Sequence, residues 1–192
     1  MAVLKKYKRH LHPGKVYRRQ DLEKWFPAVD RSLQLLVKDG TLEKLSPGMY
    51  YVPRQSVFGK TPPEEQELVK GFLKDDRFLL TSPNDYNMLG VGTTQLYNTS
   101  RVYNHKRHGE FKLGNRTFQF LRKSYFPEKV SKEFLLVDLV NNLKTLTEED
   151  QPALLKKVKL KALEMDTRKL KHLADNFGLV RTKKLFKDIL PS

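Results

Sequence analysis

Residues 15–53, KVYRRQDLEKWFPAVDRSLQLLVKDGTLEKLSPGMYYVP, decide the fold of the N-terminal part of the chain. They predict a helix over roughly Arg19–Trp25, which Pro27 halts because proline disfavours helical backbone in the preceding residue. A second helix restarts near Ala28 and ends at Gly40, a residue type that favours the left-handed cap of a helix. Four residues at helical spacing give this second helix one apolar stripe: Val29, Leu33, Leu36 and Val37.

A hairpin follows the second helix. The runs TLEKL (41–45) and MYYVP (49–53) flank the turn residues Ser46-Pro47-Gly48, and a proline ends the second run. Two short helices followed by such a hairpin form a winged helix-turn-helix, a shape that lays its second helix in the major groove of duplex DNA. The sequence therefore predicts a DNA-binding module at the N-terminus.

The outward face of the second helix holds the candidate base-reading residues: Ala28, Asp30, Arg31 and Gln34. Arginine can pair with guanine and glutamine with adenine, and the N-terminal part of the second helix reads the bases in such motifs. Residues on both helices and on the wing are candidate contacts to the DNA backbone: Arg18, Arg19, Lys24, Lys38, Lys44, Ser46 and Gly48. The alternative is a winged helix that contacts another protein, with these basic residues simply solvated.

The whole chain of 192 residues carries a formal net charge of +15, which favours an anionic partner but does not bear on the fold. The excess is uneven, with 13 basic and 5 acidic side chains in residues 1–60. The chain has no cysteines, which excludes disulfides and thiolate metal sites. No apolar run approaches the roughly 20 residues needed to span a bilayer, and the first residues lack an apolar core of signal-peptide length. We expect a cytoplasmic protein without a membrane partner.

The expected fold class is α+β, with two domains. A winged helix-turn-helix domain is expected over 1–55, and a mixed α+β domain that ends in a helical bundle is expected over 64–192. Residues 54–63, RQSVFGKTPP, are expected to be a linker because they hold a glycine and two prolines.

Several smaller elements can also be predicted. FLLT (78–81) predicts a buried strand, and Gly114-Asn115 between two alternating runs predicts a type II′ hairpin turn. A short helix is expected over Ala2–Arg9, and the chain from Ser131 onward is expected to be helical. The layout is a winged helix, then mixed α+β structure, then helices.

Sites outside the winged helix are weaker candidates. His105 and His108 form an H-x-x-H pair with Glu110 nearby, but residues three apart on a strand point to opposite faces and no third ligand is evident. We expect no metal, no cofactor and no catalytic residue. A secondary basic surface is a candidate contact for nucleic acid or an acidic partner, the alternative being solvated charge over a core: Lys106, Arg107, Lys156, Lys157, Lys159 and Lys161.

The centre of the chain is rich in aromatic residues that alternate with lysine and arginine. At strand spacing, this pattern is typical of a core on one face of a sheet and solvated charge on the other. The same interleaving can form a stacking surface for single-stranded nucleic acid. Both interpretations concern the same residues: Tyr86, Tyr97, Tyr103, Phe111, Phe118, Phe120, Tyr125 and Phe126.

Two segments carry a resemblance to one protein family. The first, GKVYRRQDLEKW (14–25) with VDRSLQLLVKDGTLEKLSPGMYYVPRQSVFG (29–59), resembles the N-terminal winged helix of AbiEi-type antitoxins. The second, FLLTSPNDYNMLGVGTTQLYNTSRVYNHKRHGEFKLGNRTFQF (78–120), is similar to the start of that family's second domain. The wing is common to many winged helices, so the second segment is the more distinctive one. Together the similarity covers about residues 13–125.

The resemblance implies an antitoxin of a type IV toxin–antitoxin pair, a class of system that acts in phage defence. It implies that the winged helix binds double-stranded operator DNA and represses its own operon, and helix-turn-helix geometry favours an inverted repeat as the operator. It also implies that the second domain counteracts a nucleotidyltransferase-like toxin from the same operon, directly or functionally. We do not expect an enzyme. The alternative is an RNA-binding or ribosome-associated basic protein without a toxin partner.

Overall fold

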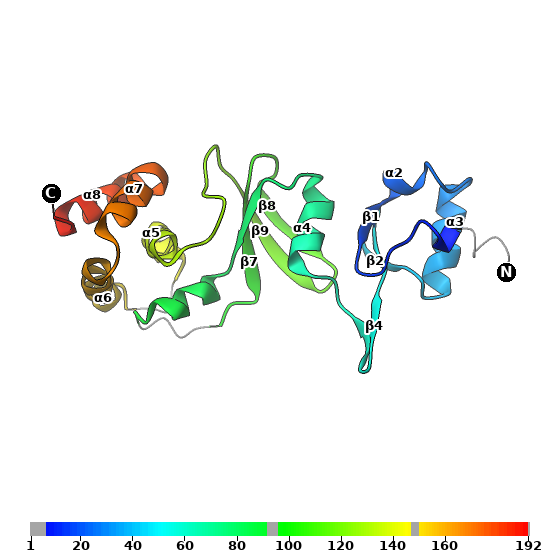
Figure 1. Cartoon of the computed structure of the whole chain (residues 1–192), viewed down its shortest axis with the longest axis horizontal. Coiled ribbons are helices and arrows are strands. Elements are labelled where there is room, and N and C mark those ends of the chain that lie inside the picture. Colours follow the sequence, from blue (N-terminus) through cyan, green and yellow to red (C-terminus); the bar gives the residue numbers. More distant parts are fainter. Residues whose placement is uncertain (1–6, 92–95, 147–149, 192) are drawn as a thin grey trace. The chain divides into compact units, whose positions relative to one another are not determined.

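A computed structural model of the chain describes residues 7–91, 96–146 and 150–191 (Figure 1). The chain divides into two compact units. One comprises Met1–Asp76 with Glu110–Thr117, and the other comprises Arg77–Gly109 with Phe118–Ser192. The structure is α+β with a helical C-terminal region, as predicted. Most of the helix expected over Ala2–Arg9 lies outside the described residues.

The first unit contains a three-stranded antiparallel sheet. Strands β1 (Val16–Arg18), β2 (Glu43–Ser46) and β3 (Met49–Tyr51) lie in the order β1-β3-β2. Strands β2 and β3 pair around the Pro47-Gly48 turn, which confirms the predicted hairpin. Strand β1 has no counterpart among the predicted elements, because three residues are too few to show an alternating pattern.

Two helices of this unit, α2 (Arg19–Leu22) and α3 (Val29–Lys38), form the helix-turn-helix. Helix α3 begins and ends as predicted. Helix α2 ends three residues before Trp25, because residues 23–25 form a turn. The apolar stripe of α3 packs with α2 and the following loop in one core, which includes Leu22, Phe26, Val29, Leu33, Leu36 and Leu42.

Residues 54–61 form a second hairpin, so the predicted linker over 54–63 is wrong for most of its length. Strand β4 (Arg54–Ser56) pairs with β5 (Gly59–Thr61). Gly59 has a φ of 103°, in the left-handed region that favours glycine. The Ser56 hydroxyl accepts a hydrogen bond from the Phe58 N–H (3.2 Å) and donates one to the Gly59 carbonyl (2.9 Å). Linkers and tight turns use the same serine and glycine residues, so composition alone does not separate them.

Helix α4 (Glu65–Leu73) belongs to the first unit, which extends to Asp76 rather than ending at residue 55 as predicted. The side chain of Arg18 in β1 explains this difference. Its guanidinium donates to the carbonyl of Gly71 at 2.8 Å and to that of Phe72, and lies 5.5 Å from the centre of the Phe72 ring. These contacts hold the last turn of α4 against β1.

Four later strands form a third sheet in the order β6-β7-β9-β8. The strand predicted over 78–81 is present, although only alternate residues, Leu79 and Thr81, are buried. Gly114 has a φ of 62° in the two-residue turn between the last two strands, in agreement with the predicted hairpin. The strands are β6 (Phe78–Thr81), β7 (Thr99–Asn104), β8 (Gly109–Leu113) and β9 (Arg116–Arg122).

The second unit contains most of the helices, which confirms the predicted helical C-terminal region. Helix α5 is its centre, since residues 134–140 are all buried, and α6, α7 and α8 pack around it (Figure 1). None of the helices within the described residues is long and apolar enough to cross a membrane. The helices are η1 (Pro83–Leu89), α5 (Lys132–Asn142), η2 (Leu143–Thr145), α6 (Gln151–Glu164), α7 (Thr167–Phe177) and α8 (Val180–Ile189).

Candidate nucleic-acid interface

The outer face of α3 carries three of the polar residues predicted to contact DNA. Arg31, Gln34 and Lys38 are all exposed, and their spacing places them on one side of the helix while the apolar stripe is buried. Leu35 shares this face and is 44% exposed, although it was not among the predicted residues. An apolar side chain in the major groove can contact the methyl group of thymine. The face therefore offers hydrogen-bonding, cationic and apolar groups to one ligand.

The start of α3 is held in a defined conformation. Ala28 precedes the helix with a φ of 48°, a left-handed conformation that is uncommon for alanine. The carbonyl of Ala28 accepts a hydrogen bond from the Ser32 N–H at 3.1 Å, and the Ser32 hydroxyl donates to the carbonyl of Pro27 at 3.2 Å. Ala28 itself is exposed and offers only a methyl group and its backbone. These bonds fix the direction in which α3 leaves the turn.

Arg19 and Asp30, predicted to contact phosphate and base respectively, are paired with each other. Arg19 Nε lies 2.7 Å from Asp30 Oδ1, Arg19 Nη2 lies 2.8 Å from Oδ2, and Glu23 also accepts a hydrogen bond from Arg19. The hydrogen bond from Arg19 lowers the pKa of the Asp30 carboxyl, and the same bond raises the pKa of Arg19. Two carboxylates therefore balance the charge of Arg19, and the bonds to Asp30 link α2 to the first turn of α3.

The two other cations predicted near α2 differ in their surroundings. The guanidinium of Arg18 is bound to the carbonyls at the end of α4, which favours a structural role over a phosphate contact. Lys24 lies in the turn after α2 and is exposed. Of these two side chains, Lys24 is the one whose position suits a phosphate.

The wing is short and lies against the helix-turn-helix. Gly48, at its turn, accepts a hydrogen bond from the N–H of Arg19 at 2.9 Å, so the turn sits at the start of α2. Ser46 and Gly48 are half-buried, whereas Lys44 on β2 is exposed. Lys44 is thus the wing residue best placed to meet a ligand.

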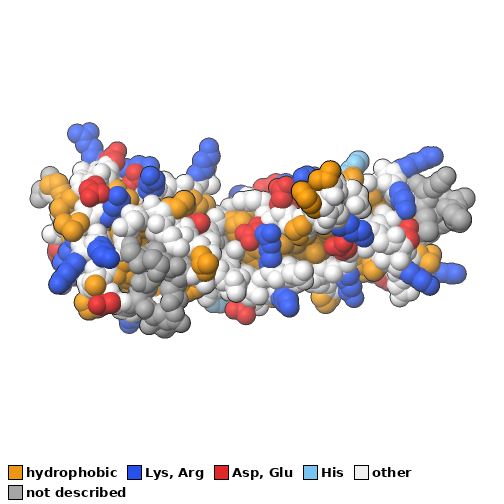
Figure 2. Space-filling view, turned by 90° about the horizontal axis from the view of Figure 1, so that it is seen from below, with side chains coloured by type: hydrophobic (Ala, Val, Ile, Leu, Met, Phe, Trp, Pro, Cys, Tyr) orange, Lys and Arg blue, Asp and Glu red, His pale blue; other side chains and the backbone are white. Residues whose placement is uncertain are grey.

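The β4–β5 hairpin exposes two apolar side chains that the sequence analysis did not select. Val57 and Phe58 at its tip are 94% and 98% exposed. In Figure 2, hydrophobic side chains gather over this hairpin. Strand β5 of this hairpin is bonded to the residues that follow α3. Lys60 Nζ donates to the carbonyl of Gly40 at 2.9 Å and lies 3.8 Å from a carboxylate oxygen of Glu43 on β2.

The predicted secondary basic surface is divided between two elements. Lys106 and Arg107 are exposed in the β7–β8 loop, and Lys156, Lys157 and Lys159 are exposed on α6, while Lys161 is half-buried and paired with Glu164 at 2.9 Å. In the same loop, a ring nitrogen of His105 lies 2.9 Å from the carbonyl of Lys123, and His108 is exposed. No group of three or more histidine, aspartate or glutamate side chains in the described ranges is arranged to hold a metal ion.

A buried polar cluster in the second unit was missed by the sequence analysis. Asp138 on α5 is 2% exposed and accepts hydrogen bonds from Tyr86 (2.6 Å) and Tyr103 (2.5 Å). Asn142 donates to the same carboxylate at 3.1 Å, and Arg101 donates to the Tyr86 hydroxyl at 2.9 Å. Burial raises the pKa of Asp138 and of both tyrosines. The available signal was a lone acid inside the apolar run FLLVDLV, since acids are almost never fully buried unless paired.

Comparison with known proteins does not assign the chain to a family: no protein-family model matches the chain, and no curated protein matches it significantly.

Proposed function

We propose that the first unit binds double-stranded operator DNA through α3 and that the chain acts as an autoregulating antitoxin. The observation that carries the DNA-binding half is the exposed face of Arg31, Gln34 and Lys38 on a helix whose other side forms the core of the helix-turn-helix. Arg31 and Gln34, near the start of α3, would meet base edges, and Lys38 would meet phosphate. The formal net charge of +15 supports an anionic ligand.

A binding experiment with duplex DNA tests this proposal. The probe is the region upstream of the chain's own gene, and the competitor is a shuffled duplex of the same composition at the same salt concentration. We expect preferential binding to the upstream duplex, and we expect Arg31→Ala to cost about 1–3 kcal/mol and to relax the preference at one base position.

The matched control is Arg168→Ala, which removes the same charge from an exposed position on α7. It should bind the upstream duplex as the wild type does. Equal affinity of the wild-type protein for the upstream and shuffled duplexes would contradict sequence-specific binding.

The antitoxin half of the proposal rests on the resemblance of residues 13–125 to AbiEi-type antitoxins. In this proposal the protein works in the cytoplasm, represses its own operon and counteracts a nucleotidyltransferase-like toxin encoded beside it. The test expresses the neighbouring gene from an unrelated promoter, with and without the full chain, and scores growth.

The variant Arg31→Ala separates the two activities in that test. It should lose repression of a reporter placed behind the operon promoter, yet still restore growth, because the second unit is unchanged. If the wild-type chain does not restore growth, the antitoxin assignment is contradicted.

A further inference from the structure

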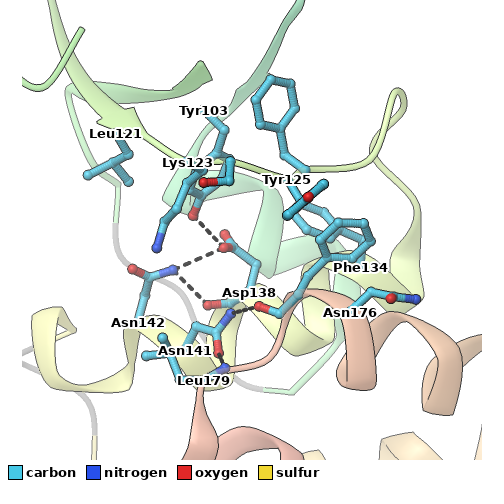
Figure 3. A pocket seen from close by; sticks show the side chains of 13 residues that line it. Tyr103, Leu121, Lys123, Tyr125, Phe134, Asp138, Asn141, Asn142, Asn176 and Leu179 are labelled. Atoms are coloured by element: carbon cyan, nitrogen blue, oxygen red, sulfur yellow. Dashed lines mark hydrogen bonds between the residues drawn. The ribbon is translucent and has the colours of Figure 1, made fainter. Parts of the chain in front are cut away.

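The second unit contains a cavity of about 310 Å³ beside the buried polar cluster. This volume is at the lower end of the roughly 300–1,000 Å³ typical of small-molecule sites. Figure 3 shows Asp138 at the centre of the cavity, with Tyr103, Asn142 and Phe134 around it. The lining comes from β7, from β9 and the segment after it, and from helices α5 and α7 with the residues after α7, so it is assembled from distant parts of the sequence.

The walls of the cavity are aromatic and are held in place by ring contacts. Phe134 lies edge-on to Tyr103, with ring centres 6.4 Å apart, and edge-on to Phe177, with ring centres 6.0 Å apart. Phe126 stacks on His105 at 4.7 Å. Because these rings are already fixed against one another, a flat ligand can pack on them without ordering new side chains.

The polar groups of the cavity have distinct chemistry. Asp138 accepts three hydrogen bonds, whereas a carboxylate has about four acceptor positions, so it can accept one more from a ligand. Lys123 is exposed, and within the described residues its ammonium group has no hydrogen bond or ion pair. In the view of Figure 3 this ammonium points toward the Asn142 side of the cavity. The site thus presents an acceptor at its floor and a cation nearer solvent.

We propose that this cavity binds a nucleotide whose base carries an exocyclic amino group. The base stacks on the aromatic walls and donates its amino hydrogen to Asp138, while the phosphate pairs with Lys123. A flat ring, a hydrogen-bond donor and an anion are the three features that the lining complements, and an amino-bearing nucleotide has all three. Single-stranded RNA is commonly read in this way, by stacking on aromatic side chains and by hydrogen bonds to base edges.

The proposal separates ligands that differ by one group. Guanosine monophosphate (GMP) and inosine monophosphate differ only in the amino group at position 2 of the purine. Cytidine and uridine monophosphates differ in whether position 4 bears an amine or a carbonyl. Losing one hydrogen bond to a charged acceptor should weaken binding at least about tenfold, so the amino form of each pair should bind more tightly.

The experiment titrates these four mononucleotides and guanosine into the full-length protein by calorimetry. In the wild type, we expect GMP to bind more tightly than inosine monophosphate and more tightly than guanosine. In Lys123→Met, which keeps most of the side-chain stem, the advantage of GMP over guanosine should disappear. The control Lys129→Met removes a charge from an exposed lysine outside the cavity lining and should leave all affinities unchanged.

A short guanine-containing RNA strand, titrated beside GMP, identifies the source of the ligand. Tighter binding of the strand points to RNA and equal binding points to a free nucleotide, and both results support the site. No heat of binding for any nucleotide or for the strand would overturn the proposal. Equal affinity for both members of each amino and keto pair, or an effect of Lys129→Met equal to that of Lys123→Met, would also overturn it.

Discussion

The two units use arginine and aspartate in opposite ways. In the first unit, Arg19 and Asp30 form a pair at the protein surface, where two parallel hydrogen bonds join α2 to α3. In the second unit, Arg101 and Asp138 are both buried and are joined through the hydroxyl of Tyr86 rather than directly. The same two residue types therefore form an exposed ion pair in one unit and part of a buried polar cluster in the other.

Solvent exposure explains the difference. Water screens the Arg19–Asp30 pair, and exposed pairs of this kind add little to stability. Asp138 is only 2% exposed, so the hydrogen bonds from Tyr86, Tyr103 and Asn142 largely replace hydration. Removing one partner from a buried cluster leaves the others unsatisfied, whereas removing one partner from a surface pair leaves the other solvated.

Replacing Asp138 should therefore have the largest effect on stability. Asp138→Ala leaves two buried tyrosine hydroxyls without their acceptor and the Arg101 charge without its counterpart, and should lower the free energy of unfolding by about 3–5 kcal/mol. Urea unfolding followed by circular dichroism measures this change. The matched variant Asp30→Ala should unfold as the wild type does, and similar destabilisation by both substitutions would contradict the comparison.

The neighbouring arginines Arg18 and Arg19 sharpen the comparison within one unit. Arg18→Ala removes hydrogen bonds from a cation to the carbonyls of Gly71 and Phe72, and should cost about 1.5–3 kcal/mol of stability. Arg19→Ala should leave the unfolding curve close to that of the wild type. On the proposed DNA interface, Arg19→Ala should weaken specific and shuffled duplexes alike. Unfolding curves and gel shifts of both variants separate the structural role of Arg18 from the DNA-binding role of Arg19. These roles are wrongly assigned if Arg18→Ala is as stable as the wild type.

The buried tyrosines predict a loss of stability at alkaline pH. Burial raises the pKa of Tyr86 and Tyr103 in the folded protein. Their contribution to stability is therefore complete below about 10, the pKa of tyrosine in the unfolded chain, and is lost as the pH rises above that value. Each such group should lower the free energy of unfolding by about 1.4 kcal/mol per pH unit in that range. In Tyr103→Phe, the free energy of unfolding should fall less steeply between pH 9 and 11 than in the wild type. An unchanged dependence on pH would count against a buried hydroxyl.

The sequence predicts the surface elements of this protein better than its buried polar groups. Helix α3 and the β2–β3 hairpin are recovered because an apolar stripe and a Ser-Pro-Gly turn are local patterns. The exposure of Arg31, Gln34 and Lys38 follows directly from that stripe. Local periodicity is sufficient wherever one face of an element meets the core and the other meets water.

Contacts between distant residues account for what the sequence does not predict. Arg18 binds Gly71 and Phe72, more than fifty residues away, and no local pattern distinguishes it from Arg19. Asp138 is separated from Tyr86 by 52 residues, so the cluster exists only once the sheet and α5 have packed. The β4–β5 hairpin was missed for a different reason, because it buries no side chain and so has no alternating pattern.

The smallest predicted effect returns to the surface pair and concerns charge alone. Asp30→Asn keeps the size of the side chain but removes one of the two carboxylates that balance Arg19, so the charge of Arg19 becomes more available to phosphate on the proposed interface. Affinity for shuffled DNA should rise a few-fold, and the slope of log K against log salt should become steeper by about 1. Binding at four salt concentrations measures the slope, with Asp175→Asn on α7 as an exposed control of the same charge change. If Asp30 instead accepts a hydrogen bond from cytosine, Asp30→Asn will weaken binding to the specific duplex while strengthening binding to the shuffled one. The two affinities therefore distinguish a carboxylate that reads a base from one that only neutralises Arg19.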